Sequence, residues 1–401
     1  MRAALLLCAC GALATSTAHA QDPATRGPLE LDEWDAGRVD AAGARIPTRV
    51  ISPTTPGPHP LLGVIHGANR TGARHVELAR TLASRGFVVV LPDLPCDFFG
   101  CDHDANAAQI IALLDWAVAR SDDASAPIAG RVDGARRGLI GHSWGALASH
   151  LAASRDDRID ALVLLDPNDD GTVGLDATAG VTAPTLQLLA AVPGTCNAQW
   201  RPDAVAGRLP SPKLTLTVSG SGHCDPEMPG DSVCPFGCGA GDPGTALVFR
   251  RYAVAWAACL LTDDDAVRPW LGGASMAGDE SGGAIEGVSA DGLDALPCAS
   301  APPVEMDAGP PDADAGPRTR DGGRDDAGAE GPRDAGPGTA DAGGGARDAG
   351  PGPDEGGGCG CRASRASPRG LPAVAAFALA LLLTRTRRRA ACGRGRPRPR
   401  P

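Results

Sequence analysis

Lysine is almost absent from this sequence. Lys213 is the only lysine among 401 residues, and this bias toward arginine, with abundant Ala, Gly and Pro, is typical of a GC-rich genome. The net charge of -11 is spread along the chain, and no basic stripe occurs in the part expected to fold. Because domains that bind nucleic acid carry such a stripe, we exclude nucleic acid as a partner.

The sequence also lacks long apolar runs. A membrane-spanning helix needs about 20 apolar residues, and no run in this chain reaches that length. The N-terminal run covers only residues 3–14, follows Arg2 and precedes Ala18-His19-Ala20, a small-x-small cleavage pattern. This combination is typical of a secretory signal peptide. We therefore expect residues 1–20 to be removed and the protein to be exported.

Residues 300–358 contain no Leu, Ile or aromatic residue, whereas Asp-Ala-Gly recurs along them. A segment of this composition cannot bury a core, and its Pro, Gly and like-charged Asp favour an extended, solvated chain. The composition thus predicts a folded domain at residues 21–299, followed by a disordered linker at residues 300–358.

The C-terminal residues 359–401 combine Cys359-Gly360-Cys361, an apolar run at 371–383 and a terminal arginine cluster. That run is too short to establish a transmembrane helix by itself. The order of glycine-rich tether, cysteine, apolar segment and arginines nevertheless resembles the C-terminal sorting tails of myxobacterial surface proteins. The resemblance implies export and tail-processing machinery as partners, and attachment to the membrane or cell surface.

Eight cysteines lie between the signal peptide and the linker: Cys96, Cys101, Cys196, Cys224, Cys234, Cys238, Cys259 and Cys298. An even number in an exported chain indicates disulfides, although the sequence does not determine their pairing. Cys96 with Cys101 and Cys234 with Cys238 are close enough for local loops. A zinc site at His223, Cys224, Cys234 and Cys238 is the alternative, because C-x3-C falls within loose zinc-ligand spacing.

Strand and helix patterns alternate along the folded domain. Apolar segments predict strands at residues 29–34, 45–52, 61–65, 87–91, 137–141, 161–165, 185–189 and 213–218. Helices are expected near residues 75–85, 106–120, 143–154 and 246–261. This order predicts an α/β fold: a mostly parallel sheet of about eight strands with helices on both faces and an antiparallel first hairpin.

The segment Gly141-His142-Ser143-Trp144-Gly145 matches the pattern G-x-S-x-G. An apolar strand runs into it and an Ala-rich helix runs out of it, which is the context of a strained strand-to-helix turn that exposes a nucleophilic serine. The two glycines allow the close backbone approach of such a turn. Ser143 is therefore the candidate nucleophile.

A serine hydroxyl needs a base to accept its proton. His223 is the only histidine that follows a strand beyond Ser143, and its loop of Gly and Ser could place the imidazole over the turn. It also fits the chain order serine, acid, histidine of this kind of site. His103, in an Asp-rich loop, is a weaker alternative for the base.

The acid that orients the histidine must lie between Ser143 and His223, where no Glu occurs. Asp166 stands at the carboxyl end of a predicted strand, on the edge of the sheet where such sites form. We therefore choose Asp166, with Asp169 and Asp170 as near alternatives.

The oxyanion of the reaction needs two backbone donors. Trp144, directly after the serine, and Ala68, in the loop after the third strand, occupy the positions where such donors belong.

These residues resemble the platelet-activating-factor acetylhydrolase, chlorophyllase and polyester-hydrolase relatives within the α/β-hydrolase superfamily. The likeness covers residues 45–261 and rests on His66-Gly67, residues 82–90, the segment from Gly141 to Gly145, and Gly222-His223. The strand-to-helix turn that carries Ser143 is called the elbow, and the helix after it is the elbow helix. In the first two relatives the acid follows the next strand after the elbow helix, as Asp166 does. Polyester hydrolases place it one strand later, where this chain has no acid.

The resemblance implies hydrolysis of carboxylic esters, small or polymeric, through a Ser-His-Asp triad with no metal and no organic cofactor. Two alternatives stay open. The same triad activates any acyl transfer, so a peptidase or acyltransferase fits the residues, and a degenerate hydrolase fold could serve as a surface binding module.

Overall fold

A computed structural model of the chain describes residues 21–97 and 100–299. The predicted signal peptide, linker and sorting tail, including the apolar run at 371–383, lie outside these residues, and the boundaries between the four predicted segments stay predictions. Within the described residues, every helix is too short or too polar to cross a membrane.

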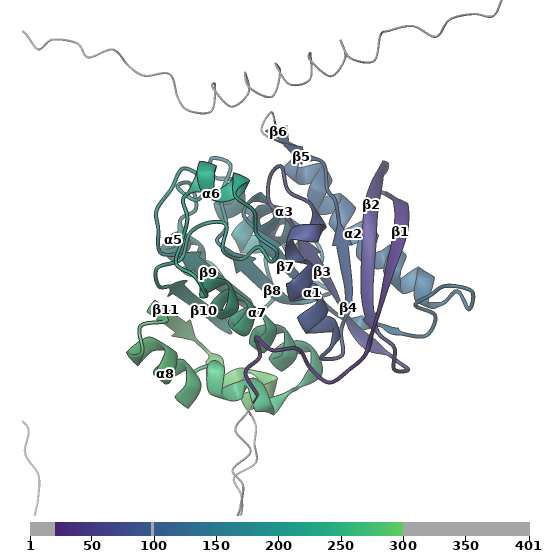
Figure 1. The fold of residues 1–401 in the computed structure, drawn as a ribbon. Coiled ribbons are helices and arrows are strands. Elements are labelled where there is room, and N and C mark those ends of the chain that lie inside the picture. The colour runs from purple at the N-terminus through teal and green to yellow at the C-terminus, as the bar shows by residue number, and fades with distance from the viewer. Residues whose placement is uncertain (1–20, 98–99, 300–401) are drawn as a thin grey trace, which may run out of the picture. The chain divides into compact units, whose positions relative to one another are not determined.

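The core of the fold is a nine-stranded sheet in the order β1-β2-β4-β3-β7-β8-β9-β10-β11 (Figure 1). Its strands are β1 (Leu31–Ala41), β2 (Ala44–Pro53), β3 (His59–Ile65), β4 (Val88–Pro92), β7 (Val132–His142), β8 (Ile159–Leu165), β9 (Thr185–Ala190), β10 (Lys213–Val218) and β11 (Ile285–Asp291). Strands β4 to β10 of this order run parallel, whereas β1 with β2 and β2 with β4 are antiparallel. The predicted mostly parallel sheet with an antiparallel first hairpin is confirmed.

The edge strand β11 is absent from the sequence prediction. It pairs antiparallel with β10, and most of its residues are exposed. The prediction missed it because its sequence, Ile-Glu-Gly-Val-Ser-Ala-Asp, has neither the apolar run of a buried strand nor a regular alternation. A small two-stranded hairpin of β5 (Cys96–Asp97) and β6 (Gly100–Cys101) also lies outside the main sheet.

Helices cover both faces of the sheet (Figure 1). The elements are α1 (Val76–Ala83), α2 (His103–Ser121), α3 (Trp144–Ala153), α4 (Val173–Ala177), α5 (Pro202–Ala206), α6 (Val233–Cys238), α7 (Thr245–Thr262) and α8 (Ala274–Ser281). Short 3-10 helices occupy Gly72–His75, Thr178–Gly180, Asp265–Trp270, Leu293–Ala295 and Pro297–Ala299. Helices α1 and α7 pack on one face, and α2 and α3 on the other.

The buried strands separate two apolar cores. In β8, Ala161, Val163 and Leu165 face the core beneath α7, while Leu162 and Leu164 face the core beneath α3. Both faces of such a strand are buried, so its sequence is a continuous apolar run. That run is the reason why the central strands could be located from the sequence.

The eight cysteines form four disulfides: Cys96–Cys101, Cys196–Cys238, Cys224–Cys234 and Cys259–Cys298. The local loop at Cys96 and Cys101 is confirmed, and a loop between Cys234 and Cys238 is wrong. These two cysteines lie four residues apart on α6 and bond to different loops. The zinc alternative is also wrong, because all three of its sulfurs are held in disulfides rather than as free thiolates.

Candidate active site

The sharp turn at Ser143 joins the end of β7 to the start of α3. Ser143 has φ 56° and ψ -125°, a conformation that L-residues rarely adopt. A Cβ atom on Gly145 would lie 2.3 Å from the carbonyl oxygen of His66, and one on Gly141 would lie 2.4 Å from the carbonyl oxygen of Gly145. Only glycine fits at both flanking positions, as the G-x-S-x-G pattern predicts.

The loop after β10 brings His223 to the serine. The Ser143 hydroxyl donates to Nε2 of His223 at 3.0 Å, and both residues are buried. The sequence-based elimination of the other histidines is consistent with this geometry. His103 instead lies edge-on against the indole of Trp144, with 5.3 Å between the ring centres.

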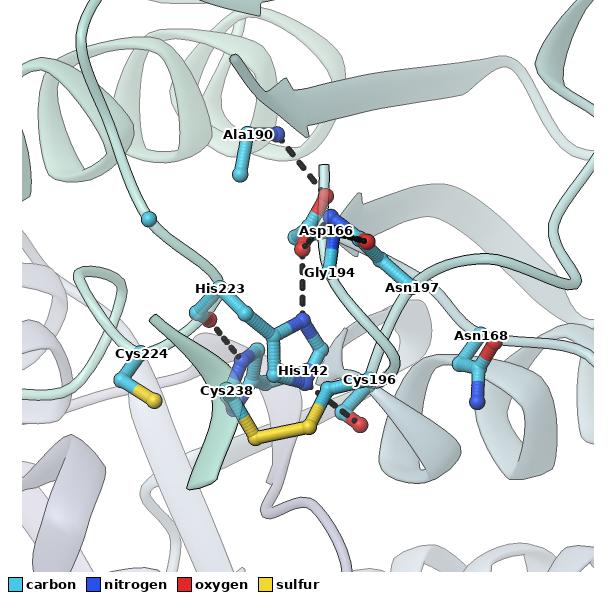
Figure 2. Close-up of polar contacts among 12 residues, drawn as sticks. His142, Asp166, Asn168, Ala190, Gly194, Cys196, Asn197, His223, Cys224 and Cys238 are labelled. Carbon is cyan, nitrogen blue, oxygen red and sulfur yellow. Dashed lines mark hydrogen bonds and ion pairs between the residues drawn. A yellow bond between two sulfur atoms is a disulfide. The ribbon is translucent and has the colours of Figure 1, made fainter. Parts of the chain in front are cut away.

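Asp166 completes the arrangement from the end of β8. Its Oδ2 accepts the Nδ1 hydrogen of His223 at 2.5 Å (Figure 2). With that nitrogen protonated, Nε2 is free to accept the serine proton, a tautomer assigned from the hydrogen bonds. Asp166 itself has φ 37°, in the left-handed region that Asp tolerates better than most residues.

The two alternative acids have other partners. The carboxylate of Asp169 accepts the backbone N–H groups of Asp170, Gly174 and Leu175, so it caps the first turn of α4. Asp170 is largely exposed and lies 3.8 Å from His103. Of the three candidates, the structure brings Asp166 to the imidazole of His223.

Two further groups hold the Asp166 carboxylate, and no pattern in the sequence predicts either of them. The backbone N–H of Ala190 donates to Oδ1 at 2.8 Å, and the side-chain amide of Asn197 donates to Oδ2 at 3.0 Å (Figure 2). Asn197 belongs to the loop after β9, next to Cys196. The Cys196–Cys238 disulfide places both sulfurs within 4.8 Å of a ring nitrogen of His223.

The two candidate oxyanion donors, Ala68 and Trp144, belong to segments that meet at Ser143. The loop after β3 passes directly against it, because a Cβ on Gly67 would lie 2.9 Å from the Cβ of Ser143. Arg70 N–H donates to the Gly67 carbonyl at 3.2 Å, which closes a turn around Ala68. Trp144 is the first residue of α3, where backbone N–H groups have no partner within the helix.

Three other buried histidines surround this region. Burial lowers the pKa of His66, holds that of His142 well below its usual range, and lowers that of His75 to about 3. These rings are therefore neutral near pH 7. His142 donates through Nε2 to the backbone carbonyl of His223 at 2.7 Å (Figure 2). His66 donates through Nδ1 to the Gly67 carbonyl, also at 2.7 Å.

Comparison with known proteins shows similarity to a PET hydrolase-like family and to enzymes that are named as cutinases. Residues 16–198 match the model of the PET hydrolase-like (PETase) family, a range that includes Ser143 and Asp166 and ends before His223. Cutinase est2 of Thermobifida alba is 26% identical over 243 residues, which cover 60% of this chain and 72% of that protein.

Two further cutinases match at similar levels. Cutinase 1 of Thermobifida cellulosilytica is 25% identical over 238 residues, 58% of this chain and 80% of its own length. A cutinase of Thermobifida fusca is 25% identical over 238 residues, 58% of this chain and 69% of its own length. Together with the sheet order and the turn at Ser143, these matches show that the chain has the α/β-hydrolase fold and is similar to the polyester-hydrolase-like branch of these proteins.

Proposed function

We propose that this protein is an exported serine hydrolase that cleaves carboxylic esters. The observation that carries the proposal is the unbroken series of hydrogen bonds from Asp166 through His223 to the Ser143 hydroxyl. Such a series is the arrangement that activates serine as a nucleophile. The similarity to cutinases and to the PET hydrolase-like family supports an ester as the substrate of the site.

The first half of the reaction transfers the acyl group to Ser143. Nε2 of His223 takes the hydroxyl proton while Oγ attacks the ester carbonyl carbon. The backbone N–H groups of Ala68 and Trp144 stabilise the negative oxygen that forms. The carbonyl re-forms as the bond to the alcohol oxygen breaks, and that oxygen leaves with the proton from His223, so an acyl-enzyme remains.

The second half returns the enzyme to its starting state. His223 removes a proton from a water molecule, whose oxygen attacks the acyl carbon. The acid product leaves as Ser143 recovers its proton from His223. Throughout both steps, Asp166 holds the imidazole in the productive tautomer and stabilises its positive form.

Export is part of the proposal. It is supported by the predicted signal peptide and by four disulfides, which persist in oxidising compartments. The linker and the sorting tail then place the hydrolase on the cell surface, or release it after processing near Cys359 and Cys361. Fractionation of cells that express the native gene, followed by detection of the protein outside the cytoplasm, tests this part.

Fluorophosphonate labelling tests the proposed chemistry. We expect the wild type to be labelled and the Ser143→Ala variant to stay unlabelled. A folded wild type that resists the reagent would instead indicate a binding module. Rates on p-nitrophenyl esters of increasing acyl length, compared with rates on peptide substrates, separate an esterase from a peptidase with the same triad.

A further inference from the structure

A buried ion pair joins two loops of the candidate active site. The guanidinium of Arg70 donates to both carboxylate oxygens of Glu227, with 2.7 Å from Nε to Oε1. The side chains are 9% and 0% exposed, so water does not replace these contacts. A two-bond arginine-carboxylate contact fixes the relative orientation of the two groups as well as their separation.

Each partner lies close to a proposed functional group. Arg70 is two residues beyond Ala68, and its N–H closes the turn that contains Ala68. Glu227 is four residues beyond His223, and its N–H donates to the Cys224 carbonyl at 3.1 Å. The ion pair therefore connects the loop of the oxyanion donor to the loop of the base, across the elbow that carries Ser143.

We propose that Arg70 and Glu227 are positioning residues that set the distance between the oxyanion loop and the His223 loop. This inference rests on the proposed function. The pair touches no reacting atom and acts through the two loops, so its loss changes how often His223 and the oxyanion donors are aligned with a bound ester.

The buried His142 gives a second connection from the same carboxylate. Its Nδ1 lies 3.9 Å from Oε1 of Glu227, and its Nε2 donates to the backbone carbonyl of His223. Nδ1 has no hydrogen-bond partner among the described residues. His142 thus stands between Glu227 and the backbone of the proposed base, and it is fixed by the elbow itself.

Neighbouring contacts reinforce the pair on its outer side. Asp231 accepts from Arg70 at 3.0 Å and from Arg74 at 2.7 Å. The backbone of Met228 donates to Arg74 and accepts from Glu77. The segment from Glu227 to Asp231 is therefore attached along its length to the chain that follows the oxyanion turn.

Burying two charges is costly, and apolar residues of similar size often give a fold equal or greater stability, so stability alone does not explain this pair. That property supplies the test. Glu227→Gln keeps the shape of the side chain and removes its charge. Arg70→Met with Glu227→Met removes both charges, so it leaves no buried charge without a partner, and we expect it to fold with a stability close to that of the wild type.

The experiment measures kcat and KM on p-nitrophenyl butyrate in the full chain, at a temperature where circular dichroism shows each variant folded. A displacement of about 1 Å at the reacting groups costs up to about 100-fold in rate. We expect kcat to fall by about 10- to 100-fold in both variants, with KM little changed. Asp279→Asn, which breaks a partly buried contact with Arg251 and Tyr252 on α7, is the matched control and should retain the wild-type kcat.

If Glu227→Gln, or Arg70→Met with Glu227→Met, folds and keeps the wild-type kcat, the positioning role is overturned. That result is distinct from failure of the proposed function, in which the wild type hydrolyses no ester or Ser143→Ala hydrolyses it at the wild-type rate. A variant in which only stability falls, with kcat intact, assigns the pair to folding alone.

Discussion

Asn197 donates its side-chain amide to Oδ2 of Asp166, the same oxygen that accepts the imidazole hydrogen of His223. The loop after β9 therefore takes part in orienting the proposed acid, although Asp166 itself follows β8. A carboxylate held by Asn197, Ala190 and His223 has little freedom to rotate away from the imidazole.

Removing the Asn197 amide should slow catalysis without weakening substrate binding. A hydrogen bond to a charged group contributes about 1.5–3 kcal/mol, so Asn197→Ala is expected to lower kcat by about 10-fold or more. Steady-state kinetics on a soluble ester measures the change. Gln199→Ala, in the same loop but bonded to Gly171 and away from the triad, is the control and should keep its kcat. Equal rates for the two variants contradict the assignment.

The choice among the three aspartates can be tested directly. Asp166→Asn should fold and lose about 10⁴-fold in kcat, because an amide favours the wrong imidazole tautomer. Asp169→Asn should keep most of its kcat and lose stability, since it weakens the cap of α4. Thermal melts and ester kinetics on both variants provide the readout, and the reverse pattern moves the acid to Asp169.

Stability should depend on pH through the buried histidines. The folded pKa of His75 is about 3, so in acid the unfolded chain binds a proton that the folded protein does not. The contribution of such a histidine to the free energy of unfolding is therefore complete above about pH 6.5. It falls as the pH drops toward 3, by up to about 1.4 kcal/mol per pH unit for each histidine of this kind. Urea titrations at several pH values measure the slope. His75→Leu should reduce it, and an unchanged slope means that His75 is not responsible.

The glycine beside the nucleophile should not tolerate a methyl group. In Gly145→Ala, the new Cβ meets the backbone carbonyl of His66, which can move only if the oxyanion loop moves. We expect a loss of both stability and activity, since overpacking costs about 1–3 kcal/mol or more. Gly278→Ala, in α8 with open space around it, should be neutral or stabilising by about 0.5–1 kcal/mol. Similar melting temperatures for the two variants would contradict the tight elbow.

The features that sequence could predict are local ones. The strand, turn and helix around Ser143 are contiguous, and β8 ends directly at Asp166, so their roles follow from neighbouring residues. His223 was found by elimination, because the order of serine, acid and histidine leaves few positions. The proposed acid, Asp166, follows β8, one strand earlier than the position expected from the resemblance to polyester hydrolases.

Features that depend on distant loops could not be predicted. The pairing of Cys196 with Cys238, the contact of Asn197 with Asp166 and the Arg70–Glu227 pair each join segments far apart in sequence. No periodicity or spacing relates such partners. The edge strand β11 was missed for a different reason, since its exposed residues need no apolar pattern.

Identification of the acylated residue tests the central claim most directly. Rapid mixing with p-nitrophenyl acetate should give a burst of nitrophenol, and acid quenching followed by peptide mass spectrometry should locate one acetyl group on Ser143. Ser143→Ala should show neither the burst nor the modification. An acetyl group on another residue, or ester hydrolysis by Ser143→Ala at the wild-type rate, would contradict the account.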